Sequence, residues 1–93
     1  MNRSRVDYEH MLEQFLRGAM PTKDFQATYL SCFKNERELD EPLFALLDEL
    51  FGDVDSFTTD PRLLAENPDF YLDEARLREK VRQTAARLSK LKR

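Results

Sequence analysis

The sequence predicts an all-α protein with the architecture of an antiparallel four-helix bundle, and three observations support this prediction. Four segments carry apolar residues at helical spacing, and each has its own start signal. The connection between the first two segments is short, which predicts antiparallel neighbours. Only 2 Gly and 4 Pro occur in 93 residues, which leaves little turn chemistry for a β-sheet. We therefore expect one helical domain over residues 1–93 and no sheet.

The first two helices are expected at residues 4–17 and from Thr22 to about residue 34. Ser4 or Asp7 can cap the first helix, and Thr22 is the predicted cap of the second. Gly18 is expected to end the first helix, because glycine readily adopts the left-handed conformation that closes a helix. The predicted apolar stripes are Tyr8, Met11, Leu12, Phe15 and Leu16 in the first helix, and Phe25, Tyr29, Cys32 and Phe33 in the second.

The stretch from Leu39 to Pro61 combines the densest apolar face with the densest run of carboxylates. Its helix is predicted to begin with Asp40 or Glu41 as the cap and Pro42 as the first helical residue. The apolar positions are Leu43, Phe44, Leu46, Leu47, Leu50, Phe51, Val54 and Phe57. We expect a sector broadly opposite to hold five carboxylates, those of Glu41, Asp48, Glu49, Asp53 and Asp55.

After Phe57 the helical period is lost, and two prolines precede the last helical segment. We expect a loop of roughly a dozen residues here, a length that is uncommon in compact domains and often functional. One short turn is predicted at residues 61–65. Asp73 is the predicted cap of the fourth helix. The apolar repeat of this helix consists of Leu77, Val81, Thr84, Ala85, Leu88 and Leu91.

The net charge of −3 conceals a strong asymmetry along the chain. Residues 36–74 hold 13 Asp and Glu against 2 Lys and Arg, whereas residues 75–93 hold 8 Lys and Arg against one Glu. The third helix thus lacks the i, i+4 pairs of opposite charge that support an exposed helix. A charge run usually marks only a solvated face, but this run continues into the loop beside aromatic residues. We interpret it as a surface for a basic protein partner, formed in the loop by Asp60, Glu66, Asp69, Phe57, Phe70 and Tyr71.

The residues offer little support for an enzyme or a cofactor protein. Cys32 lies in an apolar stripe and His10 flanks another, so we interpret them as a small core residue and a surface residue. There is no CxxC or HxxxH spacing for a metal and no glycine-rich loop for a phosphate. The basic last helix lacks interleaved aromatic residues, so we expect no direct binding to nucleic acid. The lone cysteine and the absence of a long apolar run predict a cytoplasmic protein without a membrane segment.

Three blocks occur in order along the chain: FLRGAMPTKDFQATYLSCF, LLDELFGDVDSF and LDEARLREKV. This ordered set resembles the colicin D type of immunity proteins, small bacterial proteins that protect a producing cell from its own toxin. The resemblance implies a four-helix bundle that inhibits without being an enzyme. From the helical periods themselves we expect the free protein to be a monomer. Its implied partner is the C-terminal nuclease domain of a bacteriocin or contact-dependent-inhibition toxin, with a tRNA-cleaving ribonuclease as the class.

By position, the resemblance assigns Asp55 and Asp60 to the basic active site of the toxin, where they stand in for RNA phosphates. The predicted toxin-binding set adds four neighbours, which are Asp48, Glu49, Asp53 and Phe57. The residues alone leave a second class of function open. In that alternative, the protein is a helical adaptor or regulator that uses the same acidic face to bind a basic segment or helix of another protein.

Overall fold

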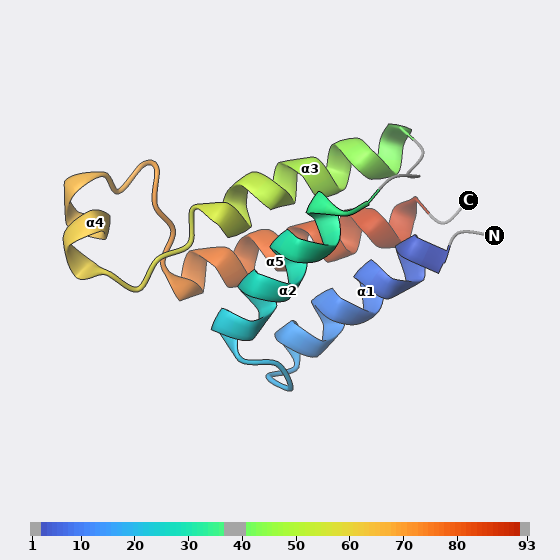
Figure 1. Cartoon of the computed structure of the whole chain (residues 1–93), viewed down its shortest axis with the longest axis horizontal. Helices are drawn as coiled ribbons and strands as arrows, with labels where there is room; N and C mark the ends of the chain where they lie inside the picture. Colours follow the sequence, from blue (N-terminus) through green and yellow to red (C-terminus); the bar gives the residue numbers. More distant parts are fainter. Residues whose placement is uncertain (1–2, 37–40, 92–93) are drawn as a thin grey trace.

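The structure, a computed structural model, describes residues 3–36 and 41–91 of the chain. These residues form no strand, and an isolated bridge between Phe57 and Leu72 is the single β-type pairing among them. The all-α prediction is confirmed, and a six-residue helix replaces the short turn expected after Pro61. In chain order the helices are α1 (Arg3–Leu16), α2 (Thr22–Lys34), α3 (Glu41–Asp55), α4 (Pro61–Glu66) and α5 (Glu74–Lys90) (Figure 1).

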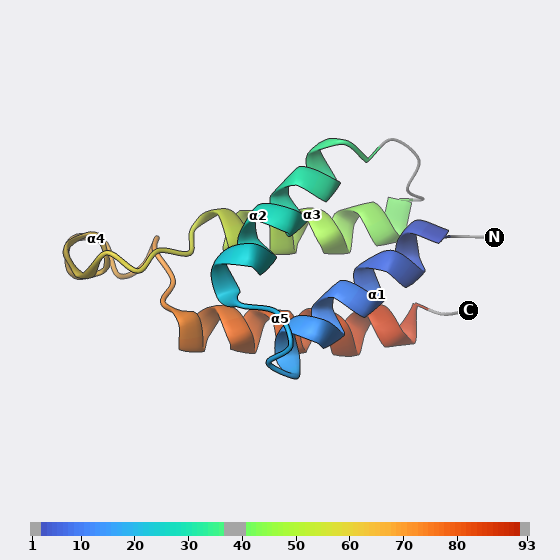
Figure 2. The same ribbon diagram turned by 60° about the horizontal axis from the view of Figure 1, so that its bottom comes forward.

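The four long helices pack as two antiparallel pairs. Helices α3 and α5 lie side by side and run in opposite directions, and α1 and α2 form a hairpin that lies obliquely against them (Figures 1 and 2). Helix α3 contacts both α2 and α5, and α1 contacts both α5 and α2. The predicted antiparallel neighbours are therefore present, and a regular four-helix bundle stays a prediction.

One hydrophobic core lies between these helices. Leu47 and Leu50, in the middle of the apolar stripe of α3, are fully buried. Between α1 and α2, the rings of Phe15 and Phe25 stack with a distance of 4.3 Å between their centroids. The predicted stripes account for this core, because each buried position belongs to one of them. The buried hydrophobic residues are Tyr8, Met11, Leu12, Phe15, Phe25, Tyr29, Leu43, Leu46, Leu47, Leu50, Val54, Phe57, Leu77, Val81 and Leu88.

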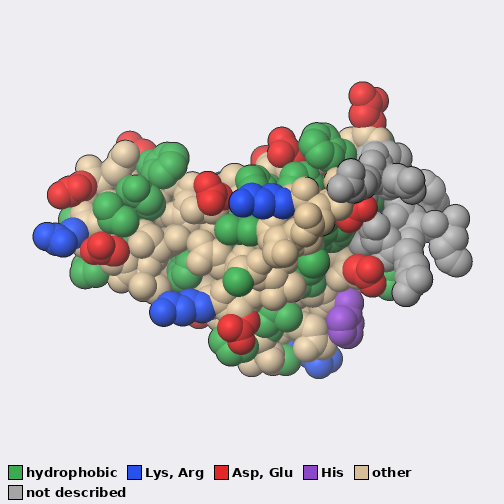
Figure 3. Space-filling view, viewed as in Figure 1, with side chains coloured by type: hydrophobic (Ala, Val, Ile, Leu, Met, Phe, Trp, Pro, Cys, Tyr) green, Lys and Arg blue, Asp and Glu red, His purple; other side chains and the backbone are tan. Residues whose placement is uncertain are grey.

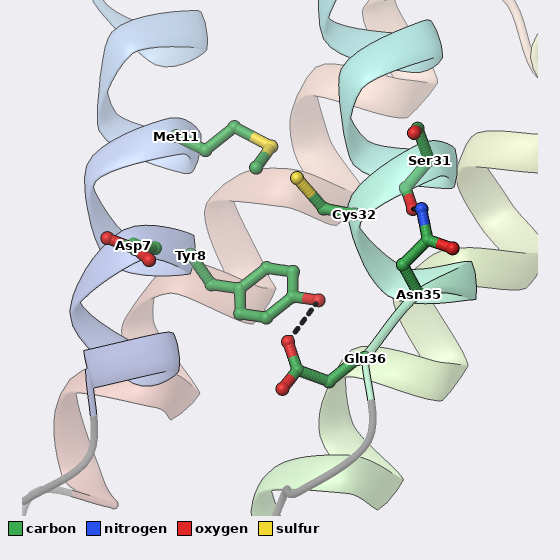
Figure 4. Close-up of a pocket in the computed structure, with 7 residues that line it drawn as sticks. All are labelled: Asp7, Tyr8, Met11, Ser31, Cys32, Asn35 and Glu36. Atoms are coloured by element: carbon green, nitrogen blue, oxygen red, sulfur yellow. Dashed lines mark hydrogen bonds between the residues drawn. The ribbon is translucent and has the colours of Figure 1, made fainter.

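Three predicted stripe residues are exposed: Cys32, Phe44 and Leu91, the last of which follows the end of α5. The side chain of Cys32 is exposed, so its assignment as a core residue is wrong. The reason is tertiary: Cys32 lines an open hollow of about 320 Å³ between α1 and the end of α2, where no side chain fills the space (Figure 4). Phe44 of α3 is 47% exposed, because it lies at the edge of the contact with α2.

The start signals of the first two helices need correction. Helix α1 begins at Arg3, so Ser4 and Asp7 lie within the helix and neither one caps it. Thr22 is already the first residue of α2, and the cap position is taken by Pro21 without a side-chain bond. Local composition favoured these caps, but it defines a helix end only to within a residue or two.

Two of the other predicted helix ends are confirmed. Gly18 closes α1 with φ at 83°, and Asp73 caps α5 by accepting a bond from the N–H of Arg76 at 2.9 Å. Of the two candidate caps for the third helix, Asp40 lies outside the described residues. Glu41 is the first residue of α3.

Three side chains connect the helices by donating to backbone carbonyls of a neighbour. The Tyr29 hydroxyl donates to the Leu47 carbonyl at 2.8 Å inside the core. Gln26 donates to the carbonyls of Val54 (3.1 Å) and Phe57 (3.3 Å), where α3 ends. Arg78 donates to the Phe15 carbonyl at 3.1 Å, with its guanidinium 4.4 Å from the centre of that ring. These bonds fix the position of α2 along α3 and of α5 against α1, and those of Gln26 and Arg78 reach carbonyls at helix ends, which need partners.

Replacing Leu47 by Ala should lower the free energy of unfolding by about 2 to 5 kcal/mol, because a fully buried leucine leaves a cavity behind. Val6→Ala is the control, since Val6 is 57% exposed and surface changes stay within about 0.5 kcal/mol. Urea unfolding followed by circular dichroism measures both. A loss below about 1 kcal/mol for Leu47→Ala would mean that the central packing of α3 is wrong.

Candidate functional site

A closed loop, residues 56–72, projects beyond the end of the long helices that lies opposite the two termini (Figures 1 and 2). We call this segment the α4 loop. At its base the N–H of Leu72 donates to the carbonyl of Ser56, and the N–H of Thr58 donates to the carbonyl of Leu72, both at 3.0 Å. A surface loop whose ends are held together in this way is compact and self-contained.

Asp60 begins the ordered part of the α4 loop. Its Oδ1 accepts a bond from the N–H of Arg62 at 2.9 Å, so it caps α4, and Pro61 occupies the first turn. The N–H of Asp60 donates to Oγ1 of Thr58 at 3.1 Å. Asp60 therefore has a local structural role, besides placing a half-buried carboxylate at the start of the projecting helix.

The second half of the α4 loop folds back onto α5. The N–H groups of Phe70 and Tyr71 both donate to the carbonyl of Asn67 at 3.1 Å, which forms a tight turn. The guanidinium of Arg76, in the first turn of α5, donates to the carbonyl of Pro68 at 2.8 Å. Arg76 thereby connects the turn to a long helix. Sequence reasoning missed this role, because nothing in the local pattern marks a contact eight residues apart.

The surface of the α4 loop is acidic and partly aromatic. Glu66 and Asp69 are exposed, and Phe70 is 55% exposed with its ring edge-to-face against Tyr71 at 4.8 Å. Acidic and hydrophobic side chains lie together over the α4 end of the molecule (Figure 3). The loop contains three carboxylates and one basic residue, Arg62. Such a surface favours contact with a positively charged partner.

The structure divides the predicted carboxylates of α3 between two sides of the helix. Asp48 and Asp55 are exposed and lie seven residues apart, which is two helical turns. Glu49 and Asp53 lie on the side of α5, where Arg87 donates to the Glu49 carboxylate at 3.3 Å. Residues two apart on a helix do not face each other, so Asp53 and Asp55 point in different directions. Asp48 and Asp55 therefore lie on a different side of the acidic surface of α3 from Glu49 and Asp53.

Asp53 is the one carboxylate of this set with a perturbed pKa. Partial burial raises its pKa above the ordinary value of 3.8, the positive charge of Lys80 on α5 opposes this shift, and the negative charge of Glu49 adds to it. The net direction is upward, so the folded protein binds the proton of Asp53 more tightly than the unfolded chain does.

Phe57 lies in the core. Only 7% of this residue is exposed, and its carbonyl accepts the bond from Gln26, so the ring is not available as a surface anchor. The helical spacing predicted that Phe57 is buried, which is confirmed, but α3 ends at Asp55 and Phe57 lies in the α4 loop. The aromatic residue that the α4 loop does present is Phe70.

The residues around the hollow between α1 and α2 give little support for catalysis or metal binding (Figure 4). Its polar contact is the Tyr8 hydroxyl, which donates to the Glu36 carboxylate at 3.3 Å, and burial raises the pKa of that phenol. In the described ranges no three His, Cys, Asp or Glu residues come close enough together to hold a metal ion. None of the helices described is both long and apolar enough to span a bilayer.

Removing the Arg76 side chain should loosen the α4 loop without unfolding the protein. Arg76→Ala deletes the bond to the Pro68 carbonyl, so amide hydrogen exchange across residues 58–72 should accelerate. The matched control is Arg82→Ala on the same helix, because Arg82 pairs only with Glu79 one turn away. Unchanged exchange in Arg76→Ala would mean that the loop is held without this contact.

Replacing Asp53 by Asn should raise the melting temperature at pH 7. A raised pKa means that protonation of Asp53 favours the fold below pH 3.8, and that this stabilisation is lost as the pH rises through the higher folded value. The neutral amide avoids that loss, so its advantage should shrink as the pH falls toward 3.8. Thermal melts of both proteins between pH 3 and pH 7 test this expectation, and a constant difference would contradict it.

Comparison with known families gives one match. The family described as bacterial self-protective colicin-like immunity matches residues 4–88, which include all four long helices almost entirely. The comparison with curated proteins found no match, and neither did the comparison with solved structures.

Proposed function

The chain belongs to the family of bacterial self-protective colicin-like immunity proteins, and from this we propose that it binds and inhibits one cognate toxin. Such proteins are inhibitors and not enzymes. The partner we propose is the C-terminal nuclease domain of a bacteriocin or contact-dependent-inhibition toxin, of the tRNA-cleaving class. The complex would form in the cytoplasm of the producing cell, where the toxin's RNA substrate resides.

The observation that supports this proposal most strongly is the charge at the projecting end of the molecule. The exposed Asp55 at the end of α3 is followed by Asp60, Glu66 and Asp69 in the α4 loop. A nuclease needs a basic cleft to hold a phosphate backbone. A compact acidic loop that projects from a helical body is complementary to such a cleft in charge.

The position of Asp55 gives a second, independent argument. Asp53 and Asp55 occupy the last turn of α3, where the helix dipole is negative, and no basic residue lies in that turn. A carboxylate there destabilises the free protein. Retaining an unfavourable charge on the surface is typical of a binding site, where stability and function compete. Asp55 is also exposed, so a partner can reach it.

The family membership favours this proposal over a general adaptor. An adaptor would also use an acidic face, but it would bind a segment of another protein without abolishing an activity. An immunity protein must cover a catalytic site, so inhibition has to be stoichiometric, with one molecule inactivating one toxin.

Reversing the charge of Asp55 should weaken the complex and leave the free protein intact. Removing one partner of a desolvated charge pair costs about 2 to 5 kcal/mol, so Asp55→Lys should lower affinity roughly tenfold or more. The free protein should be as stable as the wild type or more stable, since the change relieves the dipole. Calorimetry measures affinity for the purified C-terminal domain of the cognate toxin, which we expect to be encoded directly upstream, and thermal melts measure stability.

Two further variants make the test specific. Asp60→Asn keeps a good cap for α4 while it removes the charge, so any loss of affinity reports recognition and not folding. Asp7→Lys is the control for the change of charge alone. Asp7 is exposed and belongs to α1, which is distant in sequence from the α4 loop. Equal affinity for the wild type, Asp55→Lys and Asp60→Asn would contradict the proposed acidic interface.

A further inference from the structure

We propose that one face of α3, together with Phe33 of α2, is a second docking surface for the toxin domain, and that its occupant is a basic segment with apolar side chains. The inference rests on the proposed function and deepens it. The surface consists of Phe44, Asp48, Phe51 and Asp55 on α3 and of Phe33, and we call it the aromatic–acidic stripe.

The stripe follows from helix geometry. Its α3 positions are separated by four, three and four residues, so they lie along one line of the helix, with rings and carboxylates in alternation. Asp48 and Asp55 are exposed, Phe51 is half-buried and Phe44 is 47% exposed. Among the described residues, few large hydrophobic side chains are as open as that of Phe44. Partly exposed aromatic rings that cluster in a charged surface are frequent anchors of protein interfaces.

The rings of the stripe are held in place by the core. Phe33 lies between Phe44 and Phe51, with ring centroids at 5.4 and 5.3 Å. Behind it the ring of Tyr29 is parallel to Phe33 at 6.3 Å, and the Tyr29 hydroxyl donates to the carbonyl of Leu47. Tyr29 is fully buried. The stripe is therefore preorganised, and a partner loses little conformational entropy by binding to ordered rings.

The fold itself does not require this exposure. The core uses Leu43, Leu47 and Leu50 on another side of α3, and α3 already packs against both α2 and α5. A smaller polar residue at position 44 would lose the ring contact with Phe33 but would leave the buried leucines in place. The exposed ring is thus better explained by a partner than by packing.

Charge decides which partner fits. Asp48 and Asp55 lie on either side of Phe51 along the helix. A partner that fits the stripe therefore has basic side chains next to its apolar side chains. Lysine or arginine can pair with the carboxylates and also lie over the aromatic rings. A second copy of this chain would bring the same carboxylates together, which like charge opposes. Asp55 also adjoins the α4 loop, so the stripe and the loop form one continuous interface.

The test compares Phe44→Ala with Val6→Ala in binding to the purified toxin C-terminal domain. Phe44→Ala should lower affinity by about tenfold or more, as loss of an aromatic anchor does. Val6→Ala should bind like the wild type, because Val6 is 57% exposed but lies on α1. Phe44→Tyr should restore most of the affinity. Melting temperatures of all variants are measured alongside.

Asp48→Lys keeps the test decisive if Phe44→Ala folds poorly. It relieves crowded like charge on α3, so the free protein should stay folded, while affinity should fall about tenfold and depend less on salt. Unchanged affinity in both Phe44→Ala and Asp48→Lys, with the wild type binding normally, would overturn the stripe and leave the proposed function standing.

Two other outcomes separate the alternatives. A wild-type protein that does not bind the toxin domain would overturn the proposed function itself. Self-association that sedimentation detects and that Phe44→Ala abolishes would show that a second copy occupies the stripe, which would overturn the basic partner. Weakening by Phe70→Ala together with Phe44→Ala supports a single interface that extends from the α4 loop to the stripe.

Discussion

The burial of one face of α3 is the constraint on which the rest of the structure depends. Leu47 and Leu50 have no exposed surface, and this face is enclosed by α2 and α5. Tyr29 fixes the height of α2 along α3 through the Leu47 carbonyl, and Gln26 does the same where α3 ends. Because α3 is held on two sides, its remaining surface and the loop that follows it take up defined positions.

Much of this fold could be predicted from the sequence, because apolar spacing is a local property. The helical spacing of apolar residues correctly predicted that Tyr29 and Leu47 lie in the core. The Asp-Pro pair at residues 60–61 marked the start of a short helical segment. Cys32 shared the same period, yet it is exposed, because the separation of α1 and α2 at that point is a tertiary property. Spacing says which face a residue is on. It does not say whether a neighbour covers that face.

The candidate site was harder to predict for a related reason. Composition identified a local excess of carboxylates, but only the packing shows that Glu49 meets Arg87 on α5 while Asp55 stays exposed. Polar contacts between distant segments, such as the one between Gln26 and the end of α3, leave no periodic trace in a single sequence. Phe44 gave a misleading signal, since its position at the edge of the apolar sector looked like part of the core.

The closed base of the α4 loop makes the loop a separable unit. Because the backbone bonds between Ser56, Thr58 and Leu72 hold the entry and exit together, the path from α3 to α5 does not depend on what lies between them. The closure entropy of such a loop grows only slowly with its length. Residues 59–71 can therefore lengthen, shorten or change sequence while the helical body stays the same. A single scaffold built in this way can acquire new recognition specificities by exchanging one short surface segment.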